Sequence, residues 1–134
     1  MRKEHKMKKG FIIAAAAIII LILSYYAGSG FCQKNDVALS GYSLSADGSK
    51  LTFRTDVMSS IGFIRGFKNN GGGVRPHYLV FYSTFGGLNS AWGAKNEFEL
   101  DLSDSNTEIY FNRGKGGYEL VLQKDEKTGE WTRP

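Results

Sequence analysis

Histidine and cysteine, on which most metal and nucleophilic chemistry depends, are scarce in this chain. Its 134 residues contain two histidines, His5 and His77, and one cysteine, Cys32. A zinc site needs three or four ligands at short spacing, whereas His77 and Cys32 stand 45 positions apart. No Gly-x-Ser-x-Gly motif marks a serine nucleophile. The sequence therefore predicts no enzyme activity, no metal and no cofactor.

Acidic residues offer two further kinds of site. Asp101–Glu108 concentrates carboxylate, amide and hydroxyl oxygens, but it lacks the ligand order and the central glycine of a calcium-binding EF-hand loop. Glu97, Glu99 and Asp101 alternate with apolar residues, which is typical of the solvent-facing side of a strand. We therefore expect a turn and a solvated strand face. A hydrolase of envelope polymer that uses a carboxylate pair remains an alternative.

The segment with the strongest binding character is Ser83–Lys95, a glycine-rich loop with aromatic and amide side chains. Loops carry binding residues more often than strands do. Aromatic rings beside an amide suit a sugar or a peptide partner, so Phe85, Asn89 and Trp92 are the predicted binding residues. The alternative is that the two aromatic rings only close one end of a β-sandwich.

The N-terminal part of the chain is an apolar segment that would place the rest of the protein relative to a membrane. Phe11–Leu23 is a run of thirteen apolar residues that follows five basic ones. The uncharged stretch continues to Phe31, and its 21 residues would span about 30 Å as a helix, the thickness of a bilayer core. Tyr25 and Tyr26 would lie near the outer interface and the basic flank in the cytoplasm. We expect a cytoplasmic tail at 1–10, a transmembrane anchor or signal segment at 11–31, and an extracellular remainder.

Three alternatives involve processing of this segment. Ala27-Gly28-Ser29 offers the small residues of a signal-peptidase site. Cys32 would be the lipid-bearing residue of a lipoprotein, although Phe31 before it is larger than a lipobox has there. Gly10-Phe11 resembles the cleavage site of pilin precursors, but Ala15 stands where that family has glutamate. The length of the uncharged stretch favours a retained anchor.

The positive charge of the chain is concentrated in its first ten residues. The formal net charge is +4, and this tail holds five basic residues and one acidic residue. The remaining chain has twelve of each, so its net charge is zero. A basic tail of this kind attracts anionic lipid headgroups. Nucleic-acid binding needs a clustered basic surface on the folded part, so we expect no nucleic-acid partner.

After the apolar segment the sequence alternates as half-buried strands do, with turn residues at each break. We expect a linker at 32–36 and, at 37–134, an all-β domain that forms a single antiparallel β-sandwich of about seven or eight strands. Three of its strands have clear patterns. Phe98, Leu100 and Leu102 alternate with polar residues and are predicted to be buried on one face of a strand. The run His77–Ser83 is apolar on both faces, which indicates a central strand, and Ile61, Phe63 and Phe67 are predicted to share one face of a third strand.

Several stretches carry a resemblance to known sequences: SSIGF at 59–63, YLVFYSTFGGLN at 78–89, GAK at 93–95, IYFNRG at 109–114 and GYELVLQK at 117–124. Residues 37–133 resemble small, uncharacterised extracytoplasmic domains of Gram-positive bacteria, which usually follow a signal or anchor segment. The resemblance implies an extracytoplasmic β-domain and transfers no site residue. We expect a non-catalytic binding or sensing role at the cell envelope, with the lipid bilayer and an envelope glycan or protein as partners. The alternatives are the hydrolase and a pilin-like subunit.

Overall fold

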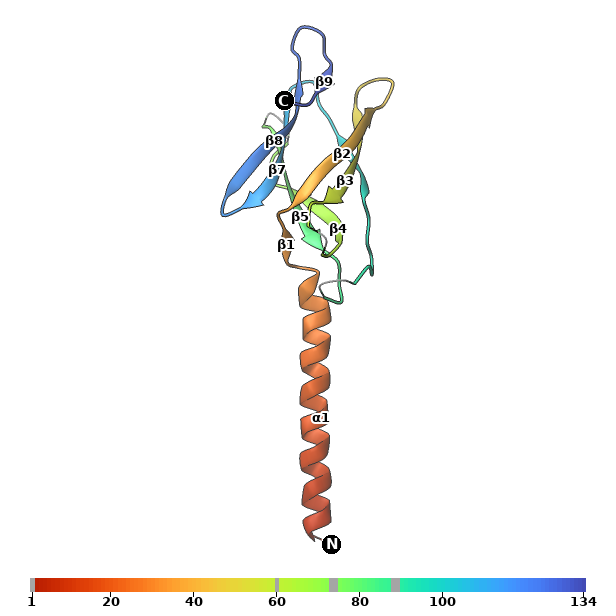
Figure 1. The fold of residues 1–134 in the computed structure, drawn as a ribbon, viewed down its shortest axis with the longest axis vertical. Helices are drawn as coiled ribbons and strands as arrows, with labels where there is room; N and C mark the ends of the chain where they lie inside the picture. The colour runs from red at the N-terminus through yellow and green to blue at the C-terminus, as the bar shows by residue number, and fades with distance from the viewer. Residues whose placement is uncertain (1, 60, 73–74, 88–89) are drawn as a thin grey trace.

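The computed structural model describes residues 2–59, 61–72, 75–87 and 90–134, with side chains from Lys8 onward. In this part of the chain one helix, α1 (Arg2–Ser29), leads into a body of β-strands. Figure 1 shows α1 projecting from one end of that body, with the C-terminus toward the end that lies away from the helix. The molecule is therefore elongated, and the two termini lie far apart.

Helix α1 takes no part in a protein core. Its stretch Lys8–Ser29 has 22 residues and is apolar enough to cross a membrane, and none of its most apolar window is buried. A core helix of a soluble protein would be mostly buried. A membrane span and an N-terminal signal sequence both have the properties of α1.

The smaller sheet has three strands in the described residues, β2 (Val37–Leu44), β3 (Lys50–Val57) and β6 (Glu97–Asp101), all antiparallel with β3 in the centre. Along β6 the buried residues Phe98 and Leu100 alternate with exposed acidic ones, which confirms the predicted one-sided strand. The acidic side chains on the outer face keep this edge soluble.

The larger sheet is built around β5 (His77–Ser83), which confirms the predicted central strand. One edge of β5 pairs with β4 (Ile64–Asn69). The other edge pairs with β7 (Glu108–Gly114) along its first half and with β1 (Gln33–Lys34) along its second. The sheet continues through β8 (Gly117–Lys124) to β9 (Trp131–Thr132). With these, the described residues contain nine strands, two of them only two residues long.

The prediction of a wholly antiparallel sandwich is wrong at one pair, because β5 and β7 are parallel. The chain leaves β5, crosses to the smaller sheet to form β6, and returns to the larger sheet as β7. A return by crossover brings a strand in from the same end as its neighbour, which makes the pair parallel. The architecture is sandwich-like and mostly β.

Phenylalanine rings from both sheets form the centre of the core. Phe53 of β3 is at most 1% exposed, and its ring lies 5.6 to 6.4 Å from four other rings, those of Phe67, Phe81, Phe98 and Phe111. Aromatic pairs at such distances add about 0.5–1.5 kcal/mol each beyond the burial of their area. This cluster joins the two sheets.

The predicted common face of Ile61, Phe63 and Phe67 is wrong. Strand β4 begins only at Ile64, which is 4% exposed, whereas Ile61 and Phe63 are 47% and 43% exposed. Gly62 has a φ of 93°, which turns the chain between these two residues and ends the alternation. Ile61 and Phe63 therefore belong to a loop at the helix end of the body.

Candidate functional site at the junction of helix and body

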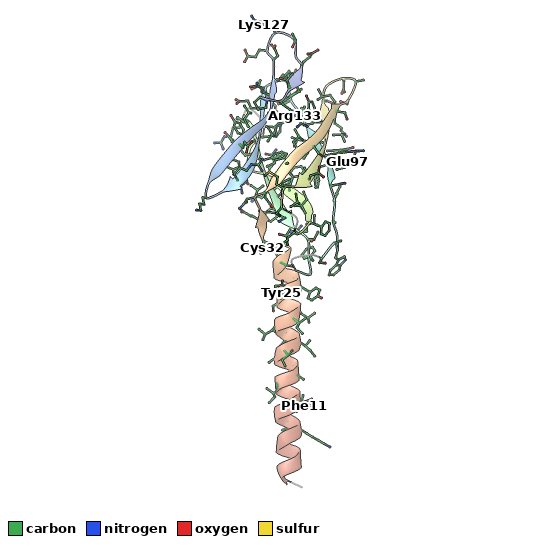
Figure 2. The ribbon with its side chains drawn as sticks, in the orientation of Figure 1. Phe11, Tyr25, Cys32, Glu97, Lys127 and Arg133 are labelled. Atoms are coloured by element: carbon green, nitrogen blue, oxygen red, sulfur yellow. The ribbon has the colours of Figure 1, made fainter. Side chains whose placement is uncertain are left out.

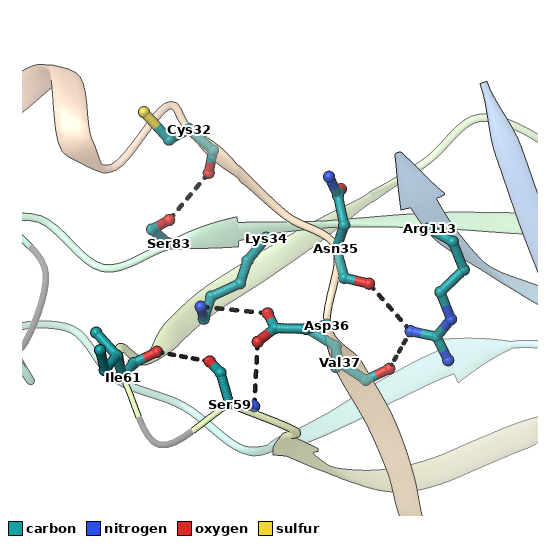
Figure 3. Close-up of polar contacts among 9 residues, drawn as sticks. All are labelled: Cys32, Lys34, Asn35, Asp36, Val37, Ser59, Ile61, Ser83 and Arg113. Atoms are coloured by element: carbon teal, nitrogen blue, oxygen red, sulfur yellow. Dashed lines mark hydrogen bonds and ion pairs between the residues drawn. The ribbon is translucent and has the colours of Figure 1, made fainter. Parts of the chain in front are cut away.

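The segment predicted as a linker is fastened to the body along its length. Gln33 and Lys34 form β1 on the central strand. The guanidinium of Arg113 donates to the carbonyl oxygens of Asn35 (3.2 Å) and Val37 (2.5 Å), as Figure 3 shows. At the start of the segment, the backbone N–H and the hydroxyl of Ser83 both donate to the carbonyl of Cys32. Helix and body are therefore joined without a flexible connection.

Asp36 ties this segment to the loop that follows β3. Its carboxylate pairs with Lys34 at 3.2 Å and accepts from the backbone N–H of Ser59 at 3.1 Å (Figure 3). Burial by itself raises the pKa of Asp36, but the hydrogen bonds of Ser59 and the ammonium of Lys34 outweigh it and leave the pKa below its usual value. The carboxylate thus stays ionised at neutral pH and keeps the loop in place.

Arg65 of β4 caps the C-terminal end of α1. Its Nε and Nη2 donate to the carbonyl of Gly30 at 2.8 and 2.5 Å. The end of a helix carries unsatisfied carbonyls and a partial negative charge, so a cation is favoured there, and α1 has no basic residue in its own last turn. The guanidinium carbon also lies 4.8 Å from the centre of the Phe85 ring and 5.6 Å from that of Phe31.

Two glycines bring the 83–95 loop against the helix. The N–H of Gly86 donates to the carbonyl of Tyr26, and that of Gly87 to the hydroxyl of Ser29, both at 3.1 Å. Gly86 and Gly87 have φ values of 93° and 101°, and a Cβ on Gly87 would lie 2.7 Å from the hydroxyl oxygen of Tyr25. Only glycine fits this conformation and this close approach.

The predicted binding residues have different environments. Phe85 is half-buried against Gly30, with its ring centre 6.1 Å from that of Trp92. Trp92 is 68% exposed. Asn89 lies outside the described residues. The structure thus brings Phe85 and Trp92 together at the helix end of the body, and Phe85 serves packing there while the Trp92 ring is available for contact.

Two neighbouring pockets lie at the junction and share Ser59, Gly62 and Phe63. The first, which we call the junction pocket, has a volume of about 580 Å³ and a mostly apolar wall that includes Tyr25, Gly28, Cys32 and Ile61. The second, which we call the polar groove, has about 660 Å³ and a mixed wall, in which Thr55, Asp56, Lys95 and Asn96 lie beside apolar residues. The groove combines a cation, an anion and an amide, which suits a ligand rich in hydrogen-bonding groups.

Reasoning from the sequence did not predict Arg65 and Asp56 as site residues, and it included Lys95 only as the last residue of the 83–95 loop. The only available signal for Arg65 is a single cation inside the otherwise apolar segment 61–67. Asp56 and Lys95 stand 39 positions apart, and only the pairing of β3 with β6 brings their surroundings together.

The chemistry of His77 and Cys32 is limited by their surroundings. His77 is 4% exposed, and its ring nitrogens lie 2.6 Å from Nδ2 of Asn69 and 2.9 Å from Oδ1 of Asn106. Burial lowers the pKa of His77, and the hydrogen bond to Asn106 offsets this only in part. Cys32 is exposed, with its sulfur 3.6 Å from the carbonyl of Gly28. Within the described ranges, no three histidine, cysteine or acidic residues could hold a metal ion together.

The chain matches no protein-family model, no curated protein and no solved structure. The resemblance to extracytoplasmic domains of Gram-positive bacteria therefore stays a prediction.

Proposed function

We propose that this chain is a single-pass membrane protein with its N-terminus in the cytoplasm and its β-body on the outer side, where it binds an envelope partner without catalysis. The observation that carries the proposal is α1: a 22-residue apolar stretch with none of its most apolar window buried, joined to the body without a flexible connection. An exposed apolar surface of that length needs an apolar environment, and its 22 residues match the thickness of a bilayer core.

The orientation follows from charge. Five basic residues precede Phe11, and basic flanks stay on the cytoplasmic side of a membrane. The partner-binding surface is the polar groove, in which Asp56, Lys95 and Asn96 would contact a glycan or an extended protein segment. A histidine-based mechanism is disfavoured, because both ring nitrogens of His77 already have partners and neither is free to act as a base toward a ligand.

The natural scarcity of cysteine makes the topology directly testable. In a Cys32→Ser background, Lys127→Cys places a thiol on the turn before β9 and Lys8→Cys places one before the apolar stretch. A membrane-impermeant maleimide added to intact cells should label the first variant and leave the second unlabelled until the cells are opened. The intact mass of the membrane-extracted protein should include residues 1–10.

Other outcomes of the same experiment separate the alternatives. Labelling of Lys8→Cys in intact cells would contradict the orientation. A mature chain that begins at Phe11 would support the pilin-like subunit, and one that begins near Gly30 would show a cleaved signal.

Binding by the polar groove can be tested with the full-length protein in detergent micelles and purified envelope polymer in a sedimentation assay. Lys95→Ala or Asp56→Ala should weaken binding about tenfold, the effect of losing one charge-assisted hydrogen bond. Lys127→Ala is the matched control, because Lys127 lies at the far tip of the body (Figure 2), and it should leave binding unchanged. Release of soluble fragments from the polymer that depends on Asp56 would instead support the hydrolase.

A further inference from the structure

Exposed apolar side chains of the body gather around the end of α1. Seven large hydrophobic residues described outside the helix are exposed, and four of them form what we call the collar: Phe31, Ile61, Phe63 and Trp92. Phe31 stands two residues after the end of α1 and packs edge-on against Phe85. Ile61 and Phe63 share the wall of the junction pocket with Tyr25 of α1. Trp92 extends the same aromatic row beyond Phe85.

The collar residues are too exposed to be explained as core. Trp92 and Phe31 are 68% and 70% exposed, and an exposed cluster of this kind marks an interaction surface. Of the three exposed residues described outside the collar, Leu44 and Tyr118 lie in the β2–β3 and β7–β8 hairpins and are 38% and 37% exposed, and Met58, in the loop after β3, is 60% exposed. The most exposed rings of the body thus adjoin the segment that enters the membrane under the proposed function.

The length of α1 sets the height at which the collar lies. From Phe11 to Tyr26 the helix rises about 24 Å, which falls short of a bilayer core of about 30 Å. Counted from Phe11, a thickness of about 30 Å is reached near Gly30, so the last turn of α1, with Tyr25 and Tyr26, lies at the outer boundary of the core. Phe31 and the residues around it must then lie at the level of the lipid headgroups.

The attachment of α1 prevents the collar from moving away from that level. Arg65 holds the carbonyl of Gly30, the loop glycines hold Tyr26 and Ser29, and β1 follows within a few residues. A flexible linker would let the body float in solvent above the membrane. Here the position of the helix fixes the position of the body.

We infer that the collar is a second membrane-binding surface, by which the body rests in the outer interface of the bilayer with Phe31, Ile61, Phe63 and Trp92 among the headgroups. The inference rests on the proposed membrane anchor. Tryptophan and other aromatic side chains favour this interface, since their rings are apolar and one end can meet water. The occupant is lipid and not protein because the collar is continuous with the apolar surface of α1.

The two tryptophans allow a direct test, since Trp92 is exposed and Trp131 is 6% exposed in the core. Full-length Trp131→Phe protein is placed in vesicles whose lipids carry bromine either near the headgroup or near the end of the acyl chain. Trp92 fluorescence should be quenched most by the shallow bromine and should lose its quenching by iodide in the water. Trp92→Phe, in which only Trp131 emits, should respond to neither. If Trp131→Phe does not fold, the quenching of Trp92 is obtained by subtracting the emission of Trp92→Phe from that of the wild type.

Matched serine variants locate the surface. Phe31→Ser and Phe63→Ser should reduce bromine quenching of Trp92 and restore iodide quenching, whereas Leu44→Ser and Tyr118→Ser should change neither. Full iodide quenching of Trp92 without bromine quenching would overturn the collar. Vesicle flotation separates this from failure of the anchor: a protein that floats with the vesicles while Trp92 stays in water retains the proposed anchor, and a protein that does not float contradicts both.

Discussion

His77 shows how one buried side chain can make the stability of the body depend on pH. Asn106 donates through Nδ2 to the carbonyl of Arg75, so its Oδ1 accepts from the Nε2–H of His77. Asn69 accepts through Oδ1 from the N–H groups of Gly71 and Tyr78, so its Nδ2 donates to Nδ1. The neutral Nε2–H form satisfies every partner. If Nδ1 of His77 took up a proton, its N–H would face the Nδ2 amide group of Asn69, which is also a donor, and the hydrogen bond between them would be lost.

The expected consequence is a loss of stability in acid. The pKa of His77 is lowered in the folded state, while the unfolded chain takes up the proton near 6.5. The unfolded state therefore binds more protons below that pH, and the free energy of unfolding should fall as the pH drops through 6.5, until the folded-state pKa is passed. Guanidinium unfolding of the full-length protein in micelles, followed by tryptophan fluorescence at several pH values, measures this.

Two variants assign the effect to His77. His77→Gln should lower stability by about 1–3 kcal/mol, because it leaves buried amide groups without their partner, and should flatten the pH dependence below 6.5. His5→Gln changes the histidine of the N-terminal tail and should keep the dependence. If the free energy of unfolding of His77→Gln fell with pH as steeply as that of the wild type, the pH dependence would come from carboxylates instead.

At the scale of elements, two glycines at the end of α1, Gly28 and Gly30, differ in their surroundings. Gly30 is buried, and a Cβ there would collide with the ring of Phe85. Gly28 is exposed, and a Cβ there would meet nothing within 4 Å. Alanine at either position changes the helix propensity, but only alanine at Gly30 disturbs the contact with the loop. Comparing the two variants therefore separates the two effects.

Gly30→Ala should displace Phe85 and open the hydrogen bonds of Gly86 and Gly87. Gly28→Ala should leave them intact and favour the helix by about 1 kcal/mol. Hydrogen exchange of the peptide 83–95 measures the outcome, because the N–H groups of Gly86 and Gly87 are bonded to Tyr26 and Ser29. Equal exchange rates in the two variants would show that the loop does not depend on the helix.

Elements with a regular pattern could be predicted from the sequence. The apolar run of α1, the alternation of β6 and the two-sided burial of β5 each follow from the residues of one segment. Ile61 and Phe63 were misplaced because the φ of 93° at Gly62 interrupts a pattern that looks continuous in the sequence. In β8, Val121 and Leu122 are both buried, because a register shift opposite Ile109 and Tyr110 allows two successive residues to face inward.

The candidate site was harder to predict, since its contacts join distant residues. Phe85 and Trp92 were recognised by composition, but their place beside α1 depends on Gly30 and Arg65. The polar groove depends on the pairing of two strands that are far apart in the sequence. Neither relation produces a periodic signal in the sequence.

At the scale of the whole molecule, the position of β1 gives the body its fixed relation to the helix. The chain enters the larger sheet at Gln33, four residues after α1 ends at Ser29. There β1 pairs with the same edge of β5 as β7 does. Arg113 and Asn112 of β7 both hold the segment where β1 ends. Tilting of the helix would therefore be transmitted to the central strand.

The bond between Gly87 and Ser29 also bears on the alternative in which a signal peptidase cleaves the chain. Ala27, Gly28 and Ser29, the small residues that a signal peptidase would recognise, lie in the last turn of α1. The hydroxyl of Ser29 accepts from the N–H of Gly87, which stands 58 positions later in the chain. During synthesis this turn leaves the ribosome first and remains uncovered until the loop has been made and has folded. Proteases cut locally open chain, so cleavage competes in time with folding. Under the cleaved-signal alternative, the proportion of anchored and released protein would be set by the ratio of these two rates, and slower folding would yield more of the released form.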